Sequence, residues 1–172
     1  MENSTSLKEA IWSQFGASLD MLENAITMCP DEHWDSALNF CYISYHCIFW
    51  TDYYLTTDPS KFEPPPPFTF SEFDPTLKKP EEIYTKTELL SYLAHCRAKA
   101  SELIAGLTIE KLNERWINDY KNFSVLEILL YNTRHVQHHS AQLNLLLRQA
   151  VNNAPAWVSQ AQKRLLVLSS TS

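Results

Sequence analysis

The chain has 172 residues, a formal net charge of −6, 45% hydrophobic residues and 20% charged residues, a composition typical of one globular domain. Nucleic-acid binding requires clustered Lys and Arg, which this acidic chain lacks, and no segment approaches the roughly 20 apolar residues of a membrane span. We therefore expect a single domain over residues 1–172 with neither nucleic acid nor membrane among its partners.

The first half of the chain predicts two long helices. Apolar residues recur at three- and four-residue spacing over residues 6–27, and Ser6 with Glu9 has the spacing of a capping box. Cys29-Pro30-Asp31 ends this helix, and the PDEHW that follows indicates a short helical turn. The second helix, over residues 36–56, is apolar or aromatic on nearly every side. Such a helix is expected in the middle of the fold.

A proline-rich crossover follows, TTDPSKFEPPPPFTFSEFDPTLKKPEE, which holds seven of the nine prolines and four phenylalanines. Consecutive prolines cannot continue a helix and favour extended backbone. A loop of this length is either functional or disordered in most compact domains. Its phenylalanines favour a segment that packs on the helices over a free docking peptide.

Two more helices are predicted in the second half. Thr85 with Glu88 begins one over residues 86–106, which Gly106 can end, and Ser124 with Glu127 begins another over residues 125–151. The sequence thus predicts an all-α fold, a four-helix bundle with the long crossover between its second and third helices.

The last helix carries an unusual histidine cluster, RHVQHHSAQL. His135 and His139 are four residues apart, about 40° around the helix axis, so both imidazoles can converge on one ion. His138 is about 100° from His139, so these two cannot easily share a metal. Either His135/His139 or His135/His138 could be the pair. We prefer the first, because Gln142 continues its stripe.

A third ligand is available on the second helix. An HxxxH pair alone is more often explained by hydrogen-bonded polar residues, and zinc takes three or four protein ligands. His46, inside YISYHCIFW, would cost a few kcal/mol if buried without a partner. Tyr42, one turn away, is an alternative hydrogen-bond partner. Taken together with His135 and His139, a metal site is the more economical interpretation.

These residues resemble the DinB/YfiT-like metalloenzyme family. The resemblance rests on Tyr45-His46-Cys47, on S-x-x-E from Ser124 to Glu127 and on the H-x-x-x-H-x-x-Q that ends at Gln142. It is extended by Trp116, the doubled HH and APAW near the C-terminus. It implies an up-down-down-up bundle, often dimeric, whose three histidines bind a divalent metal, commonly zinc or nickel. By position these ligands are His46, His135 and His139.

The resemblance also implies a function. Characterised relatives resemble thiol-dependent transferases and isomerases that use bacillithiol, mycothiol or glutathione. We hypothesise a metal-dependent enzyme that activates a low-molecular-weight thiol or water for attack on a small electrophile, with its catalytic residues unknown. Gln142, Tyr42 and Tyr53 are candidates for orienting a substrate or a ligand histidine. The crossover and the segment around Trp157 are candidates for a roof over the site.

The alternative hypothesis is a non-catalytic metal-binding or stress-response bundle that acts as an interaction module; a closed metal site would favour it. No ExxH, HExxH or GxSxG occurs, which disfavours di-iron, zincin and α/β-hydrolase sites. The four cysteines lack CxxC spacing and predict reduced thiols in a cytoplasmic protein, with Cys47 a small buried residue. The 12% aromatic content and the LLVL near the C-terminus suggest a third hypothesis, a dimeric interaction protein. A homodimer is compatible with either of the first two hypotheses.

Overall fold

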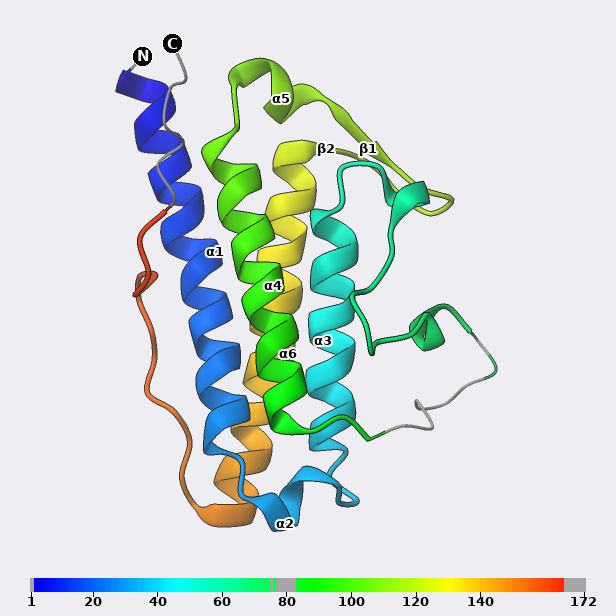
Figure 1. The fold of residues 1–172 in the computed structure, drawn as a ribbon. Helices are drawn as coiled ribbons and strands as arrows, with labels where there is room; N and C mark the ends of the chain where they lie inside the picture. The colour runs from blue at the N-terminus through cyan, green and yellow to red at the C-terminus, as the bar shows by residue number, and fades with distance from the viewer. Residues whose placement is uncertain (1, 75, 77–82, 166–172) are drawn as a thin grey trace.

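The computed structural model describes residues 2–74, 76 and 83–165, and these are mostly helical. Four long helices, α1 (Glu2–Met28), α3 (Phe40–Leu55), α4 (Lys86–Ala105) and α6 (Val125–Val151), lie side by side (Figure 1). Helix α1 packs against α4 and α6, and α3 packs against the same two helices. The all-α prediction is confirmed apart from one two-stranded sheet.

The direction of the helices explains the long crossover. In Figure 1, α1 and α6 run one way, and α3 and α4 run the other. Because α3 and α4 are parallel neighbours, their connection must return along the helices, and 20 helical residues span about 30 Å. The crossover contains the 3-10 helices η1 (Pro59–Lys61) and η2 (Ser71–Phe73).

The predicted packing of the crossover is confirmed for part of it. Phe62 and Phe68 are buried, whereas Phe70 and Phe73 are 48% and 42% exposed. The remainder of this prediction concerns residues 75 and 77–82, which lie outside the described residues. The buried side chains of Phe62 and Phe68 therefore hold the first part of the crossover against the helices.

Two of the three predicted capping boxes are present in the structure. The Thr85 and Ser124 side chains each accept the backbone N–H of the glutamate three residues later, and that glutamate returns a hydrogen bond. Each reciprocal pair satisfies two of the N–H groups that a helix start leaves open. Helices α4 and α6 therefore begin where the local sequence predicts.

The first two helices begin elsewhere. The Ser6–Glu9 capping box was wrong, because α1 already begins at Glu2 and Ser6 lies within it; neither glycine nor proline interrupts the segment before it. The predicted start of the second helix at residue 36 was also too early. Asn39 adopts φ 58°, a left-handed conformation that asparagine tolerates, and α3 begins at Phe40.

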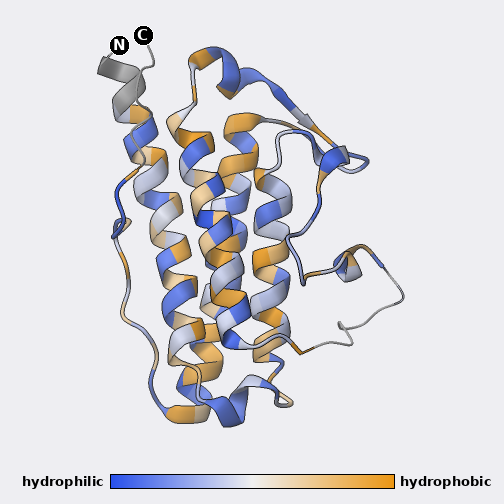
Figure 2. Ribbon diagram, viewed as in Figure 1, coloured by the Kyte–Doolittle hydropathy of each residue, from blue (hydrophilic) through white to orange (hydrophobic). Residues whose placement is uncertain are grey.

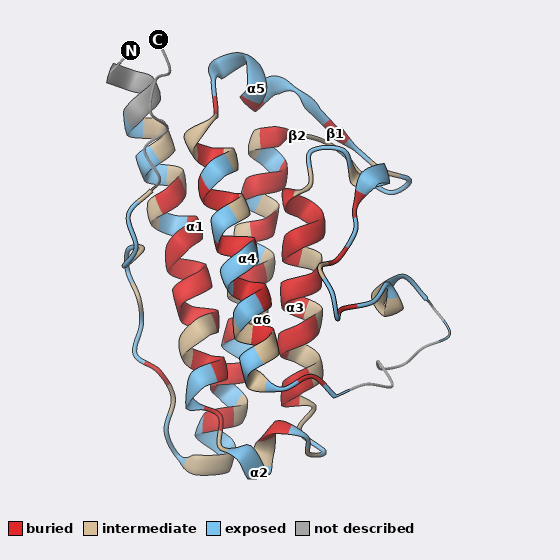
Figure 3. Ribbon diagram, viewed as in Figure 1, coloured by how far each residue is buried: buried red, intermediate tan, exposed pale blue. Residues whose placement is uncertain are grey.

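The core lies where the four helices meet. Of the 16 residues of α3, 12 are buried. The helix is not central as predicted, because α1 and α3 each pack against α4 and α6; aromatic residues of the crossover such as Phe62 also cover α3. Apolar residues (Figure 2) and buried residues (Figure 3) gather along the faces by which the helices contact one another.

Short elements close the ends of the helices. The predicted turn after α1 is helix α2 (Asp31–Trp34). Helix α5 (Ile109–Asn113) leads into an unpredicted hairpin of β1 (Arg115–Ile117) and β2 (Asn122–Ser124), antiparallel with Trp116 opposite Phe123. Trp116 is buried and donates its Nε1–H to the Thr56 carbonyl at 2.9 Å. The tryptophan thus ties the hairpin to the end of α3.

The C-terminal segment runs back along α1 (Figure 1). The Ala161 N–H donates to the Ser13 carbonyl at 2.9 Å, and Trp12 Nε1–H donates to the Lys163 carbonyl at 2.8 Å. Gly16 permits this approach, since a Cβ there would lie 2.6 Å from the Ala161 Cβ. The LLVL stretch begins at Leu165, and its other residues lie outside the described residues.

Candidate functional site

Three imidazoles from two helices lie together at the α3–α6 contact. The ring centroids of His46 and His139 are 4.8 Å apart, those of His135 and His139 are 4.6 Å apart, and those of His46 and His135 are 5.8 Å apart. His138 is exposed, and its described ring contact is with His139. Of the two histidine pairs left open by the sequence, the structure brings His135 and His139 to His46.

Glu72 of the crossover holds His46. Its Oε2 lies 2.6 Å from His46 Nδ1 and 2.9 Å from Trp50 Nε1. The Glu72 side chain is only 6% exposed, so this carboxylate is nearly buried between two N–H donors. Because a carboxylate accepts, His46 carries its proton on Nδ1 and has its lone pair on Nε2 when neutral.

The segment around Glu72 is anchored to α3. The Tyr45 hydroxyl donates to the Thr69 carbonyl at 2.9 Å and lies 3.2 Å from Ser71 Oγ. The Phe73 ring packs edge-on against Phe49, with ring centroids 5.2 Å apart. Helix η2 is therefore fixed on both sides of Glu72, which explains how a loop residue reaches the histidines.

The other two histidines also donate to oxygen acceptors. His139 Nδ1 lies 2.7 Å from Gln142 Oε1, and His135 Nε2 lies 3.3 Å from the Cys47 carbonyl. Each bonded nitrogen therefore carries the proton of a neutral ring, and the lone pair is on His139 Nε2 and on His135 Nδ1. Ligating histidines commonly donate their second nitrogen in this way.

Two of the three histidines of α6, His135 and His139, are held neutral at physiological pH. Burial, with the nearby His139 and His46, lowers the pKa of His135 from 6.5 to about 3. Burial and then His46 lower the pKa of His139 to about 4. A metal ion is ligated by neutral imidazole, so these rings need lose no proton to bind one.

The donor set fits a divalent transition metal in chemistry and spacing. Nitrogen lies about 2.0–2.1 Å from zinc, which puts the centroids of two ligating imidazoles about 5 Å apart, close to the separations seen here. As placed, however, no three His, Cys, Asp or Glu side chains in the described part of the chain could hold a metal ion. The three rings lie together, but their free nitrogens do not converge on one point.

The three side chains predicted to orient a ligand or substrate lie in different places. Gln142 bonds to His139 as described above. The Tyr42 ring lies 6.0 Å from that of His46, and burial and then the Glu72 carboxylate raise its pKa. Tyr53 contacts Asn118 through its hydroxyl at 3.1 Å and packs on Trp116; its described contacts include none of the three histidines.

The sequence reasoning did not identify Glu72 or Trp50. The one available signal was a carboxylate between two phenylalanines, in FSEF. The expectation that the Trp157 segment covers the site was wrong. That segment lies along α1, and Trp157 is 70% exposed. The crossover reaches the site from the other side, through Glu72.

Comparison with known proteins decides the family. The sequence-family model of the DinB superfamily matches residues 14–143, three quarters of the chain. The chain belongs to the DinB superfamily. The matched region contains all three histidines and Glu72. No curated protein and no solved structure matches the chain.

An open pocket lies beside the histidines of this DinB-superfamily chain. It has a volume of about 430 Å³ and is lined by Tyr131, Arg134, His135, Gln137 and His138. Volumes of roughly 300–1,000 Å³ are typical of small-molecule sites. His135 thus belongs both to the histidine cluster and to a pocket that a ligand can enter.

All four cysteines are free and buried. Burial raises the pKa of Cys29 and of Cys41 to about 11. Burial also raises the pKa of Cys47 and of Cys96. Cys47, next to His46 in the sequence, is 0% exposed, which agrees with its interpretation as a small core residue. This chain therefore presents no thiolate of its own at the histidine cluster.

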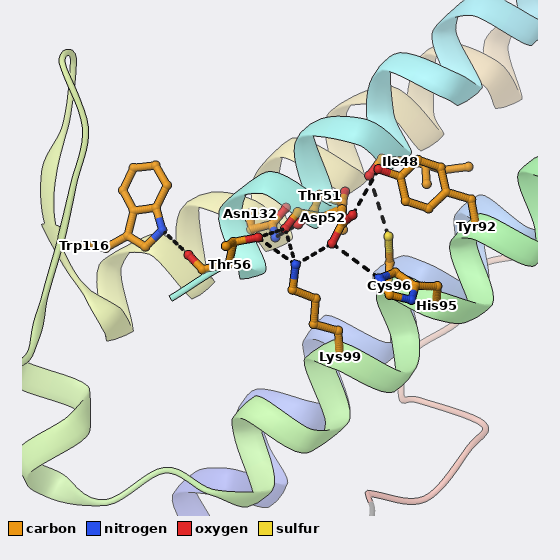
Figure 4. Close-up of polar contacts among 10 residues, drawn as sticks. All are labelled: Ile48, Thr51, Asp52, Thr56, Tyr92, His95, Cys96, Lys99, Trp116 and Asn132. Atoms are coloured by element: carbon orange, nitrogen blue, oxygen red, sulfur yellow. Dashed lines mark hydrogen bonds and ion pairs between the residues drawn. The ribbon is translucent and has the colours of Figure 1, made fainter. Parts of the chain in front are cut away.

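A second polar cluster joins α3 to α4 (Figure 4). The Lys99 ammonium donates to Asp52 Oδ1 at 2.6 Å and to Thr56 Oγ1 at 2.6 Å, and the Tyr92 hydroxyl donates to Asp52 Oδ2 at 3.0 Å. The Asp52 side chain is 1% exposed. Both Asp52 oxygens accept hydrogen bonds from side chains of the neighbouring helix α4. We therefore assign this cluster to the stability of the fold.

The described helices contain no candidate membrane span: none combines the length and the apolar character needed to cross a bilayer.

Proposed function

We propose that this chain is a metal-dependent enzyme in which His46, His135 and His139 bind one divalent ion, zinc or nickel, for a reaction on a small electrophile. The observation that carries the proposal is the convergence of three imidazoles from two helices, each donating its other nitrogen to an oxygen acceptor. Membership of the DinB superfamily fits a metal-dependent enzyme.

The metal would be held by His46 Nε2, His139 Nε2 and His135 Nδ1, the nitrogens that carry the lone pairs. Gathering them requires the rings to turn about their side-chain torsions. All three residues are intermediate in exposure, so the turn takes place at the edge of the core. Glu72 and Gln142 would then fix the orientation of His46 and His139, as hydrogen-bond partners of ligating histidines do.

A divalent ion held by three neutral histidines would act as a Lewis acid and activate a bound water or thiol at neutral pH. The chain contributes the neutral imidazoles, the carboxylate that orients one of them and the pocket beside His135. Its own cysteines are buried with raised pKa values. We therefore propose that the thiol of a thiol-transfer reaction is a low-molecular-weight co-substrate.

The alternative is a non-catalytic metal-binding or stress-response bundle. A structural zinc site is normally closed by four protein ligands and sealed. The 430 Å³ pocket that includes His135 among its lining residues favours the enzyme, because a small molecule can approach this ligand.

We also propose that residues 1–172 form one DinB-like domain, an up-down-down-up four-helix bundle, and that it acts as a cytoplasmic homodimer. The opposed directions of α1/α6 and α3/α4 in Figure 1 support the bundle arrangement. The four free cysteines support a reducing compartment. Exposed aromatic residues such as Tyr120, 89% exposed, and Trp157 support an interface between two copies of the chain.

The test is the metal content of untagged protein, measured for the wild type and for His46→Ala, His139→Ala and His138→Ala. We expect about one zinc or nickel per chain in the wild type, retained in His138→Ala and lost in the other two variants. Wild-type protein that stays metal-free after incubation with zinc or nickel would refute the metal centre. Loss in His138→Ala with retention in His139→Ala would refute the ligand assignment.

A further inference from the structure

The pocket beside His135 has a basic wall. Arg134 lines it directly. The Lys121 ammonium lies 5.1 Å from the Tyr131 ring centroid and 5.6 Å from that of Tyr54. Tyr131 lines the same pocket, and the Tyr54 ring packs edge-on against His135. One cation thus lines a pocket that opens on a histidine of the candidate metal centre, and a second lies against the ring of Tyr131, which lines the same pocket.

Neither cation is neutralised within the described part of the chain. No described carboxylate forms an ion pair with Arg134 or Lys121, whereas Arg97 and Lys99 pair with Asp20 and Asp52. The described lining of the pocket includes no Asp or Glu. In a chain of net charge −6, two uncompensated cations beside a pocket form a local field that attracts anions.

The lining also offers suitable donors. Arginine presents five N–H groups in a planar fork that matches the oxygens of a carboxylate or phosphate. The Gln137 amide and the Tyr131 hydroxyl can each donate a further hydrogen bond. The chemistry of this wall is therefore that of a small-anion site, and His135 stands at its edge.

We propose that this pocket is an anion subsite, in which Arg134, supported by Lys121, binds the carboxylate or phosphate group of a small molecule beside His135. Anion binding itself requires no metal. The role of the subsite in substrate recognition rests on the proposed function, because it places the rest of the bound molecule against the metal centre.

The test is a titration followed by amide chemical shifts at fixed ionic strength, with succinate and inorganic phosphate as separate probes. Succinamide, of similar shape and without charge, is the control ligand. We expect at least one anion to shift resonances around residues 131–138 while succinamide does not. Whichever anion binds more tightly identifies the preferred group.

Substitutions locate the site. Arg134→Gln should weaken binding of the anion roughly two- to fivefold, the range expected for an exposed ion pair, and Arg134→Glu should abolish it. Arg148→Gln, an exposed arginine in the last turn of the same helix, is the matched control and should bind as the wild type does. Equal binding by wild type and Arg134→Glu, shifts away from residues 131–138, or no binding of either anion would overturn the subsite.

The titration is run on chelator-treated protein and on protein incubated with zinc. Anion binding in both forms supports the subsite whatever the metal content proves to be. Zinc uptake without anion binding would refute the subsite and leave the proposed function standing, so the two failures are distinguishable.

Discussion

The Glu72 carboxylate accepts the Nδ1–H of His46 at 2.6 Å, although 26 positions separate the two residues. This bond makes the crossover part of the candidate metal centre. It also leaves the opposite nitrogen of His46 with its lone pair, which is the form that a metal ligand requires.

Removing the Glu72 carboxylate should weaken metal binding without removing a ligand. We expect zinc affinity to fall by about 10- to 100-fold in Glu72→Ala, because partners of ligating histidines have effects of this size, and by less in Glu72→Gln, whose amide oxygen can still accept. Competition with a chromophoric chelator measures the change. Glu63→Gln, an exposed glutamate of the same crossover, is the control.

Nitrogen NMR of the metal-free protein separates this role from packing. In the wild type, His46 should carry its proton on Nδ1, and in Glu72→Ala the tautomer should shift toward a mixture. Unchanged affinity and an unchanged tautomer in Glu72→Ala would show that Glu72 does not position His46.

The metal-free protein should lose stability in acid through two of the three α6 histidines, His135 and His139. The pKa values of His135 and His139 are lowered to about 3 and about 4, whereas both residues titrate near 6.5 in the unfolded chain. The unfolded state therefore binds protons first as pH falls, so stability is full above about 6.5 and declines toward about 3. His135 alone should contribute a loss on the order of 3 kcal/mol.

Urea unfolding of chelator-treated protein between pH 7.5 and 4 measures this loss. His135→Leu should have a shallower dependence of unfolding free energy on pH than the wild type. Identical slopes for the two proteins would contradict the proposed burial of a neutral His135.

The Asp52–Lys99 pair should matter far more than a surface pair. Lys99→Met leaves a carboxylate that is 1% exposed without its cation. Breaking a buried pair costs about 3–5 kcal/mol, and because the Lys99 side chain is 28% exposed we expect about 2–3 kcal/mol. Lys61→Met, which breaks an exposed pair with Asp58, should cost less than about 1 kcal/mol.

Denaturant unfolding of the two variants provides the comparison. Equal destabilisation by Lys99→Met and Lys61→Met would show that water screens the Asp52 cluster as effectively as a surface pair.

The four cysteines should be inert in the folded protein. All are buried, and burial raises the pKa of each thiol, so little thiolate is available to react. A disulfide reagent should label no cysteine rapidly under native conditions and all four in denaturant. Rapid native labelling of Cys47 would instead place a protein thiol beside His46 and remove the need for an external one.

Local patterns in the sequence were sufficient for most of the helices. The Thr85 and Ser124 capping boxes and the periodicity after them predicted α4 and α6 to within a residue, because a helix start depends on residues three or four apart. The same locality misled at Ser6, where the capping motif occurs inside a helix that nothing upstream interrupts. The hairpin around Trp116 was missed because its three-residue strands are too short for a period-two pattern.

What the sequence by itself determined was therefore the helical class, the four long helices, the DinB resemblance and the geometry of His135 and His139 along one helix. Only the tertiary structure decided that His46 faces His139 instead of His138, that Glu72 orients His46 and that the Trp157 segment lies on α1. These depend on how α3 is rotated against α6 and on the path of a 30-residue crossover. Contacts of that kind join residues far apart in the chain, and local periodicity carries no information about them.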